Sequence, residues 1–313
     1  MNKEKIKCSL LLFLAALIWG TSFVTQSKGM DYMGPFTFNG ARSVMAAVVL
    51  FPLAMMRRKK SMAKGSTEAG SVAKEKSLLI GGICCGLALA AASTFQQFGI
   101  QYTTVGKAGF ITTLYIIFVP ILGIFIGRKA PKIVWIGAML AAVGMYLLCM
   151  QESLHLGKGD ALVFICALLF SIHILVIDHF SPGVDGVMLS CIQFTVCGVL
   201  CMICAFIFEH PTWGQLMGGI LPLIYSGVFS GGIGYTLQIL GQKGLNPTVA
   251  ALLCSLESVV SALAGYGAYR IGFLQEDQTL SGRQILGCGL VFLAVILVQL
   301  PMDKIIKKRN TSR

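Results

Sequence analysis

One acidic residue, Glu257, lies in the middle of an apolar stretch that is long enough to cross a bilayer. A charged side chain at that depth costs about 2.5–3.5 kcal/mol, so its carboxyl group should face water or the protein interior. Residues that follow one another at i, i+3, i+4, i+7 and about i+11 share one helical face, and here they are Cys254, Glu257, Ser258, Ser261 and Gly265. This polar stripe predicts a cavity lining. Glu257 could exchange a proton or contact a cationic solute group, or it could be neutral and bond a neighbouring helix.

Further polar and aromatic residues inside apolar stretches could line the same path. Tyrosine and tryptophan join an apolar body to a hydrogen-bonding tip, and a glutamine amide both donates and accepts. Histidine could relay protons, although a lone membrane histidine more often bonds one other helix. Ordinary helix packing is the alternative for each residue. The expected path residues, besides Cys254, Glu257 and Ser258, are Trp19, Phe23, Gln96, Thr112, Tyr115, His173, Tyr235 and Gln238.

The composition indicates which kind of structural element carries these residues. The chain has 313 residues, of which 56% are hydrophobic and 12% are charged, whereas soluble domains carry about 25% charged residues. This excludes a soluble enzyme, a disordered chain and a disulfide scaffold. Spanning segments must be helical, because lipid offers the backbone no hydrogen-bond partners. We therefore predict an all-α polytopic membrane protein with ten transmembrane helices, near 8–27, 34–56, 77–99, 106–126, 132–149, 159–178, 186–208, 218–240, 247–269 and 282–301.

The net charge of +12 is concentrated in alternate connections between the apolar runs. Lysine and arginine mark the cytoplasmic side of membrane proteins, and here they gather before residue 8, between 57 and 76, near 128–132 and after 303. We therefore expect a multi-pass protein of the cell membrane with both termini cytoplasmic and a basic cytoplasmic tail at 302–313. Such segments attract anionic lipids, and nothing in their setting predicts binding to nucleic acid.

An internal repeat divides the chain. Segment 96–128 aligns without a gap on segment 238–270, and both occupy the third-to-fourth helix of their halves. An odd number of spans in each half would invert one half relative to the other, as in many secondary transporters. We predict one five-helix repeat over 1–150 and another over 151–301. The alignment pairs Gln96 with Gln238, Thr112 with Cys254, and Tyr115 with Glu257.

The same segments resemble the drug/metabolite transporter superfamily, EamA type. The resemblance lies in Phe95 through Leu148, in the run from Ala250 to Glu257, in Leu17-Ile18-Trp19-Gly20-Thr21-Ser22-Phe23, and in Arg42. It implies a ten-helix bundle of two inverted five-helix repeats that moves small organic solutes. Such proteins commonly have proline after the glutamate of the ninth helix, where this chain has Ser258. We therefore expect no local unwinding that depends on that proline.

We predict a secondary transporter for small organic metabolites or drugs, without a cofactor or a metal. Amino acids, nucleobases, vitamins and drugs are all open as solutes, and so are a monomer and a homodimer. A channel-like protein and a receptor or scaffold are the alternatives. An intramembrane enzyme is disfavoured, because Glu257 is the one central carboxylate and Cys201-Met202-Ile203-Cys204 lies in an apolar helix. Arg42 is expected to anchor its helix at the outer interface by extending its long side chain.

Overall fold

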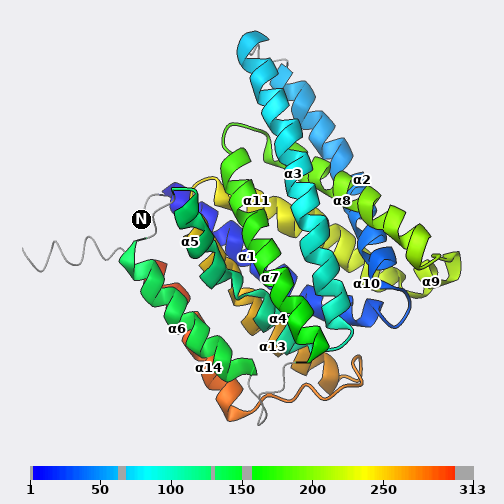
Figure 1. Cartoon of the computed structure of the whole chain (residues 1–313), viewed down its shortest axis with the longest axis vertical. Helices are drawn as coiled ribbons and strands as arrows, with labels where there is room; N and C mark the ends of the chain where they lie inside the picture. Colours follow the sequence, from blue (N-terminus) through cyan, green and yellow to red (C-terminus); the bar gives the residue numbers. More distant parts are fainter. Residues whose placement is uncertain (1–2, 63–67, 128–130, 150–156, 300–313) are drawn as a thin grey trace, which may run out of the picture.

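The computed structural model describes residues 3–62, 68–127, 131–149 and 157–299, and in these residues the protein is helical with no strand (Figure 1). Eight helices are long and apolar enough to cross a membrane, and two shorter apolar segments cover 132–144 and 282–298. The prediction of an all-α polytopic membrane protein is therefore confirmed. The ten-helix inverted repeat stays a prediction, and the basic tail at 302–313 lies outside the described residues.

Seven of the predicted spans are single helices. Each is an apolar run that satisfies its own backbone hydrogen bonds, as a lipid environment demands. Their outward faces carry large exposed apolar side chains such as Val48, Leu87 and Phe206, which suits a surface in contact with lipid. The seven helices are α1 (Lys3–Gly29), α2 (Pro35–Met62), α3 (Glu68–Ile100), α6 (Lys132–Cys149), α7 (Lys158–Phe180), α8 (Gly186–Phe208) and α14 (Gly282–Gln299).

Two of the expected continuous helices are interrupted near their middle. The run 106–126 forms α4 (Val105–Thr112) and α5 (Tyr115–Phe125), and the run 247–269 forms α12 (Pro247–Cys254) and α13 (Leu256–Arg270). Hydroxyl side chains at each break bond backbone carbonyls one turn earlier, and such bonds compete with regular helix geometry. Thr113 Oγ1 donates to the Phe110 oxygen at 2.8 Å, and Ser255 Oγ donates to the Leu252 oxygen at 2.7 Å. The second break therefore forms without a proline at position 258.

The eighth predicted span is also irregular. It consists of α10 (Ile220–Ile224), the π-helix η1 (Tyr225–Tyr235) and α11 (Thr236–Gln242), and the short α9 (Trp213–Gly218) precedes it. Glycines allow η1 to approach its neighbours closely. A Cβ atom at Gly227 would lie 3.0 Å from the carbonyl oxygen of Arg42, and one at Gly234 would lie 2.7 Å from the indole nitrogen of Trp19. A π-helical stretch inside a longer helix is uncommon and often marks a functional position.

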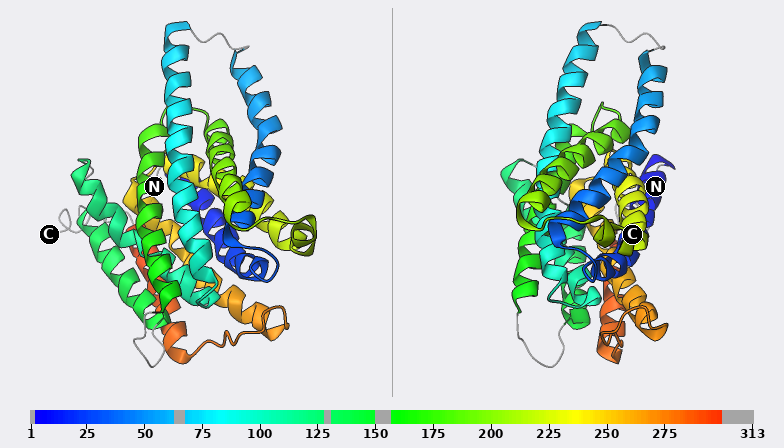
Figure 2. Two further views of the ribbon diagram at one scale, coloured as in Figure 1. Left: turned by 45° about the vertical axis from the view of Figure 1, so that its right-hand side comes forward. Right: turned by 90° about the vertical axis from the view of Figure 1, so that its right-hand side faces the viewer.

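The helices pack into one bundle from which two arms extend. α2 packs on α8, α3 packs on α7 and α8, and α1 packs on α13, while α6 and α14 lie side by side. Figure 2 shows α2 and α3 rising together beyond the other helices. At 1.5 Å per residue, the 28 residues of α2 span about 42 Å and the 33 residues of α3 about 50 Å, whereas the hydrocarbon core is about 30 Å thick.

Polar contacts fix two helix ends outside the apolar core. The carboxylate of Glu209, at the end of α8, accepts hydrogen bonds from the backbone nitrogens of Phe36 and Thr37 at 2.9 and 2.7 Å, and caps the start of α2. Asp160, at the start of α7, accepts hydrogen bonds from Thr103 Oγ1 at 2.8 Å and from Lys107 Nζ at 2.5 Å. These contacts tie connections to helices that are distant in sequence.

A third polar contact joins the ends of α2 and α8 near the predicted cytoplasmic side. Asp185 caps α8 by accepting bonds from the Val187 and Met188 nitrogens, and its Oδ2 lies 2.8 Å from Arg57 Nε. Partial burial alone would raise the pKa of Asp185. The hydrogen bonds from Arg57 and from the two backbone nitrogens outweigh this effect and lower the pKa below its ordinary value.

Candidate functional site

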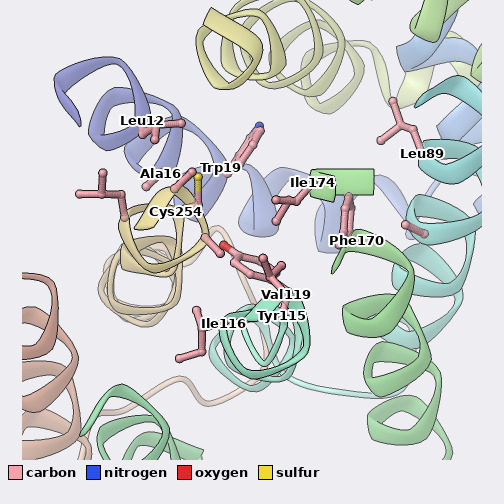
Figure 3. Close-up of a cluster of buried hydrophobic side chains, with 14 of the residues drawn as sticks. Leu12, Ala16, Trp19, Leu89, Tyr115, Ile116, Val119, Phe170, Ile174 and Cys254 are labelled. Carbon is pink, nitrogen blue, oxygen red and sulfur yellow. The ribbon is translucent and has the colours of Figure 1, made fainter. Parts of the chain in front are cut away.

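A cavity lies at the centre of the bundle, between residues from both halves of the chain. The empty space among its lining atoms is about 460 Å³ when the part open to solvent is included. Figure 3 shows part of its surroundings, where Trp19 of α1, Tyr115 of α5, Phe170 of α7 and Cys254 of α12 belong to one cluster of buried side chains. The lining residues are Trp19, Phe23, Gln26, Arg42, Gln96, Thr112, Tyr115, Phe170, Ile174, Ser230, Tyr235, Gln238, Cys254 and Glu257.

Glu257 and Tyr115 meet in this cavity. The Tyr115 hydroxyl donates a hydrogen bond of 2.9 Å to Glu257 Oε1, and both side chains are almost fully buried. Each residue lies in the first turn after a helix interruption, Tyr115 at the start of α5 and Glu257 in α13. The interruptions therefore bring a phenol and a carboxyl group together. Such a pair can hold a proton or present hydrogen-bonding atoms to a solute.

The residues immediately before these interruptions, Thr112 and Cys254, line the same cavity. Gln96 Nε2 donates to Thr112 Oγ1 at 3.2 Å, and this bond joins α3 to α4 inside the cavity lining. Cys254 is a buried free thiol at the end of α12. The Oε1 atoms of Gln26 and Gln238 are buried without a hydrogen-bond partner among the described residues. These two oxygens could accept hydrogen bonds from a solute or from water.

Aromatic side chains form the apolar part of the wall. Trp19 donates from Nε1 to the carbonyl oxygen of Ser230 in η1 at 3.3 Å, and its ring centroid lies 4.7 Å from that of Tyr235. Beyond this contact, Thr25 Oγ1 lies 2.9 Å from Ser226 Oγ, so α1 and η1 are joined by several polar contacts. The π-helix therefore forms one wall of the cavity and is held in place by α1.

Arg42 lies in an environment that differs from the one predicted from the sequence. Its side chain was expected to extend to the outer interface, but it is only 8% exposed and lines the cavity. The expectation was wrong because α2 packs against η1 and α8, which enclose a side chain that an isolated helix would leave free. The sequence signal for this burial was the position of Arg42, which lies inside the apolar run 34–56 and not at its end. The other lining residues outside the predicted set are Gln26, Phe170, Ile174 and Ser230.

Two of the eleven predicted path residues do not line the cavity. His173 Nε2 lies 3.1 Å from Gln193 Oε1, so the histidine makes the single helix–helix bond that was its alternative interpretation. Ser258 donates from its hydroxyl to the Ser255 carbonyl oxygen at 2.7 Å and takes part in the helix interruption. The structure brings the other nine together, namely Trp19, Phe23, Gln96, Thr112, Tyr115, Tyr235, Gln238, Cys254 and Glu257.

Thiols and acids do not gather into a metal-binding cluster in the part of the chain that the structure describes. Cys201 and Cys204 are free thiols in α8, and Cys201 Sγ lies 3.8 Å from Thr94 Oγ1. Ser43 Oγ donates to Cys197 Sγ at 3.4 Å. These contacts are those of small side chains packed between helices.

Comparisons with known proteins give one consistent result. The sequence model of the EamA-like transporter family matches this chain twice, over residues 6–150 and 157–300. An uncharacterized transporter of Archaeoglobus fulgidus is 30% identical over 298 residues, which cover 95% of this chain and 87% of that protein. The uncharacterized inner membrane transporter YedA of Escherichia coli K12 is 23% identical over 92% of this chain and 89% of its own length.

A solved structure extends the comparison to the fold. One protein of known crystal structure superposes with a TM-score of 0.68 at 17% sequence identity, over 93% of this chain and 96% of that chain. This likeness shows a shared helical fold.

Proposed function

The chain belongs to the EamA-like transporter family, and from this premise we propose that it is a secondary carrier that works by alternating access. It is a multi-pass membrane protein that transports small solutes, and its named relatives are transporters. We propose that its solutes are small organic metabolites or drugs, and that it moves them across the cytoplasmic membrane with both of its termini in the cytoplasm.

The central cavity is the observation that carries this proposal. A carrier needs a mid-membrane site between two bodies that can move against each other. Nine residues that the sequence singled out, from both halves of the chain, surround the cavity. Equivalent positions contribute in pairs, because Gln96 and Gln238 both line it, as do Thr112 and Cys254. This supports two repeats over 1–150 and 151–301 that face each other across the site.

The two interrupted helices support the same division. α4 and α5 are separated at 113–114, and α12 and α13 are separated at Ser255. These positions coincide when segment 96–128 is aligned on segment 238–270. Interrupted helices at matching positions of two halves are typical of transporter binding sites. The two separate matches to the family model, over 6–150 and 157–300, point the same way.

We assign proton exchange to Glu257. Its carboxyl group lines the cavity, so a proton can reach it when the cavity is open to water. The titratable groups in electrostatic contact with it come from four other elements: Tyr115 of α5, Tyr235 of η1, Cys254 of α12 and Cys166 of α7. Arg42 of α2 lines the same cavity. Among the described residues that line the cavity, Glu257 is the one carboxylic acid, and this supports the assignment.

Solute counterflow tests the carrier mechanism. A metabolite library is first screened for compounds that raise the melting temperature of the purified protein, because a ligand stabilises the state that it binds. A radiolabelled form of the strongest stabiliser is then placed outside proteoliposomes that contain the unlabelled compound. A carrier gives saturable uptake that internal solute accelerates. Linear, gradient-driven flux would instead indicate a channel, and stabilisation without flux would indicate a receptor or scaffold.

A further inference from the structure

Arg42 brings a buried positive charge into the cavity. It is located on α2, its side chain is 8% exposed, and it lines both the central cavity and a smaller side cavity of about 230 Å³. A guanidinium group remains charged under all physiological conditions and has five N–H donors. An arginine at this depth therefore needs an anion or several acceptors nearby.

The described part of the chain supplies no such anion. Arg42 forms no ion pair and donates no side-chain hydrogen bond among those residues, where the four ion pairs involve other cations. The ionisable groups with the largest electrostatic effect on Arg42 are Tyr235 and the thiols of Cys166, Cys197 and Cys201, and none of these is a carboxylate. The Phe38 ring lies 5.6 Å from the guanidinium carbon, but an aromatic face does not satisfy N–H donors directed elsewhere.

Glu257 does not neutralise Arg42 directly. No ion pair within 4.0 Å joins them among the described residues, and Glu257 Oε1 is already bonded to Tyr115. Tyr235 is within electrostatic range of both residues and lines the same cavity. The cavity thus has an arginine in one part of its wall, a carboxyl group in another, and the apolar surfaces of Trp19 and Phe170 in its lining.

We propose that Arg42 is an anion-binding subsite, and that the transported solute has a compact oxyanion, a carboxylate or a phosphate, attached to an apolar body. The fork of N–H donors matches two oxygens of such a group. The oxyanion supplies the charge that Arg42 lacks, while the apolar body contacts the aromatic side chains. The inference rests on the proposed carrier function, because it names the class of solute for the same cavity.

Four small solutes with related aromatic bodies test the subsite by their effect on the melting temperature of the purified protein. They are 3-phenylpropanoate, phenyl phosphate, 3-phenylpropylamine and 3-phenylpropanol. We expect one or both anions to stabilise the wild-type protein more than the amine and the alcohol, and the better anion identifies the oxyanion. Equal stabilisation by all four, no stabilisation by any, or a preference for the amine would overturn the proposal.

Substitutions assign the preference to Arg42. Arg42→Gln should weaken binding of the preferred anion about 10- to 100-fold, the range for a lost charged hydrogen bond, and should leave the alcohol unchanged. Arg42→Lys keeps the charge without the fork and should give an intermediate loss. Arg270→Gln is the matched control, because Arg270 is an exposed side chain that bonds Tyr266 at a helix end. An unchanged anion preference in Arg42→Gln would contradict the assignment.

If Arg42→Gln does not fold, Arg42→Lys and the wild-type ranking still decide the outcome. Counterflow separates this inference from the carrier proposal. If counterflow continues while the anions have no advantage, the anion subsite is wrong and the carrier stands. If no solute exchanges, the carrier mechanism fails, whatever the anion ranking.

Discussion

The hydroxyl of Tyr115 donates a hydrogen bond of 2.9 Å to Glu257 Oε1, and the two residues are 142 positions apart in the chain. The same separation aligns segment 96–128 with segment 238–270. Two equivalent positions that touch each other must lie close to the axis relating their halves. The bond therefore marks the expected seam of the bundle, where a solute would contact both repeats at once.

Replacement of Glu257 by glutamine should lower transport or change its dependence on pH. Glutamine keeps the shape of the side chain and can still accept the Tyr115 hydrogen bond, but it cannot exchange a proton. Membrane insertion should be unaffected, because an amide is easier to bury than a carboxylate. Counterflow measured across the neutral range checks this. Glu276→Gln changes an exposed acid and is the control, and an unchanged pH profile in Glu257→Gln would remove Glu257 from the mechanism.

Replacement of Tyr115 by alanine should alter solute preference. The ring is part of the cavity wall, and its loss enlarges the site and removes a hydroxyl. Tyr115→Phe separates the two effects, since it keeps the ring and leaves Glu257 Oε1 without its donor, at a cost of about 1–3 kcal/mol. Competition by a panel of unlabelled solutes against one labelled solute measures the change. Identical competition profiles for wild type and Tyr115→Ala would contradict a role in the site.

Gly144→Ala should destabilise the contact between α6 and α14. A Cβ atom there would lie 2.7 Å from the Gly287 carbonyl oxygen and 2.9 Å from the Val291 nitrogen, and these backbone atoms cannot move aside. We expect a loss of about 1–3 kcal/mol, as for other overpacked positions. Gly289→Ala is the matched control in α14, because a Cβ atom there meets nothing within 4 Å. Melting temperatures in detergent should fall for the first variant and not for the second.

Glu209→Ala should loosen the start of α2. The carboxylate accepts hydrogen bonds from the Phe36 nitrogen and from both the nitrogen and the hydroxyl of Thr37. Loss of a helix cap costs about 0.5–2 kcal/mol, and faster hydrogen exchange at the first turn of α2 would locate the effect there. Glu276→Ala, in an exposed connection, should leave both stability and exchange unchanged. Equal exchange in both variants would show that Glu209 does not act as a cap.

Stability should fall in acid partly through Asp185. Its pKa is lowered in the folded protein, so the stabilisation is present above its ordinary pKa and is lost as the pH falls through the folded value. Asp185→Asn should keep the helix cap but lose the pairing with Arg57, and should flatten the acid side of the stability profile. Asp185→Ala should lose the cap as well. The effect is small, about 0–1 kcal/mol for the half-exposed ion pair, and an unchanged acid limb in Asp185→Asn would exclude it.

The presence of the apolar helices could be predicted from composition, because a bilayer permits few alternatives for an apolar run of 20 residues. Their extent was less predictable, since α2 and α3 continue beyond the predicted spans 34–56 and 77–99. The interruptions at Thr113 and Ser255 could not be predicted, since they depend on hydroxyl bonds within turns that hydropathy does not register. Hydropathy likewise does not register the π-helix over 225–235, which packs closely on its neighbours at Gly227 and Gly234. Regular helical spans were therefore predictable from the sequence, whereas the helix interruptions and the π-helix were not.

The residues of the candidate site also include some that could be predicted from the sequence and some that could not. Helical spacing and the internal alignment brought out Glu257, Tyr115 and Thr112, because these residues lie on faces that recur in both halves. Arg42 escaped this reasoning, since a side chain of its length could reach several environments and only the packing of α2 against its neighbours selects one. His173 was predicted to line the path because of its residue type alone. Its hydrogen bond with Gln193 shows that it joins two helices instead.

Trp19, which contacts Tyr235 in the cavity wall, can report on the cavity through its intrinsic fluorescence. The chain has three tryptophans, and Trp19 is the one that lines the cavity, while Trp213 is 74% exposed. The emission wavelength of an indole ring shifts with the polarity of its surroundings. In a variant that keeps Trp19 and has phenylalanine at 135 and 213, binding and release of a solute would therefore shift the emission maximum of Trp19. Cargo without any label could then be followed in real time.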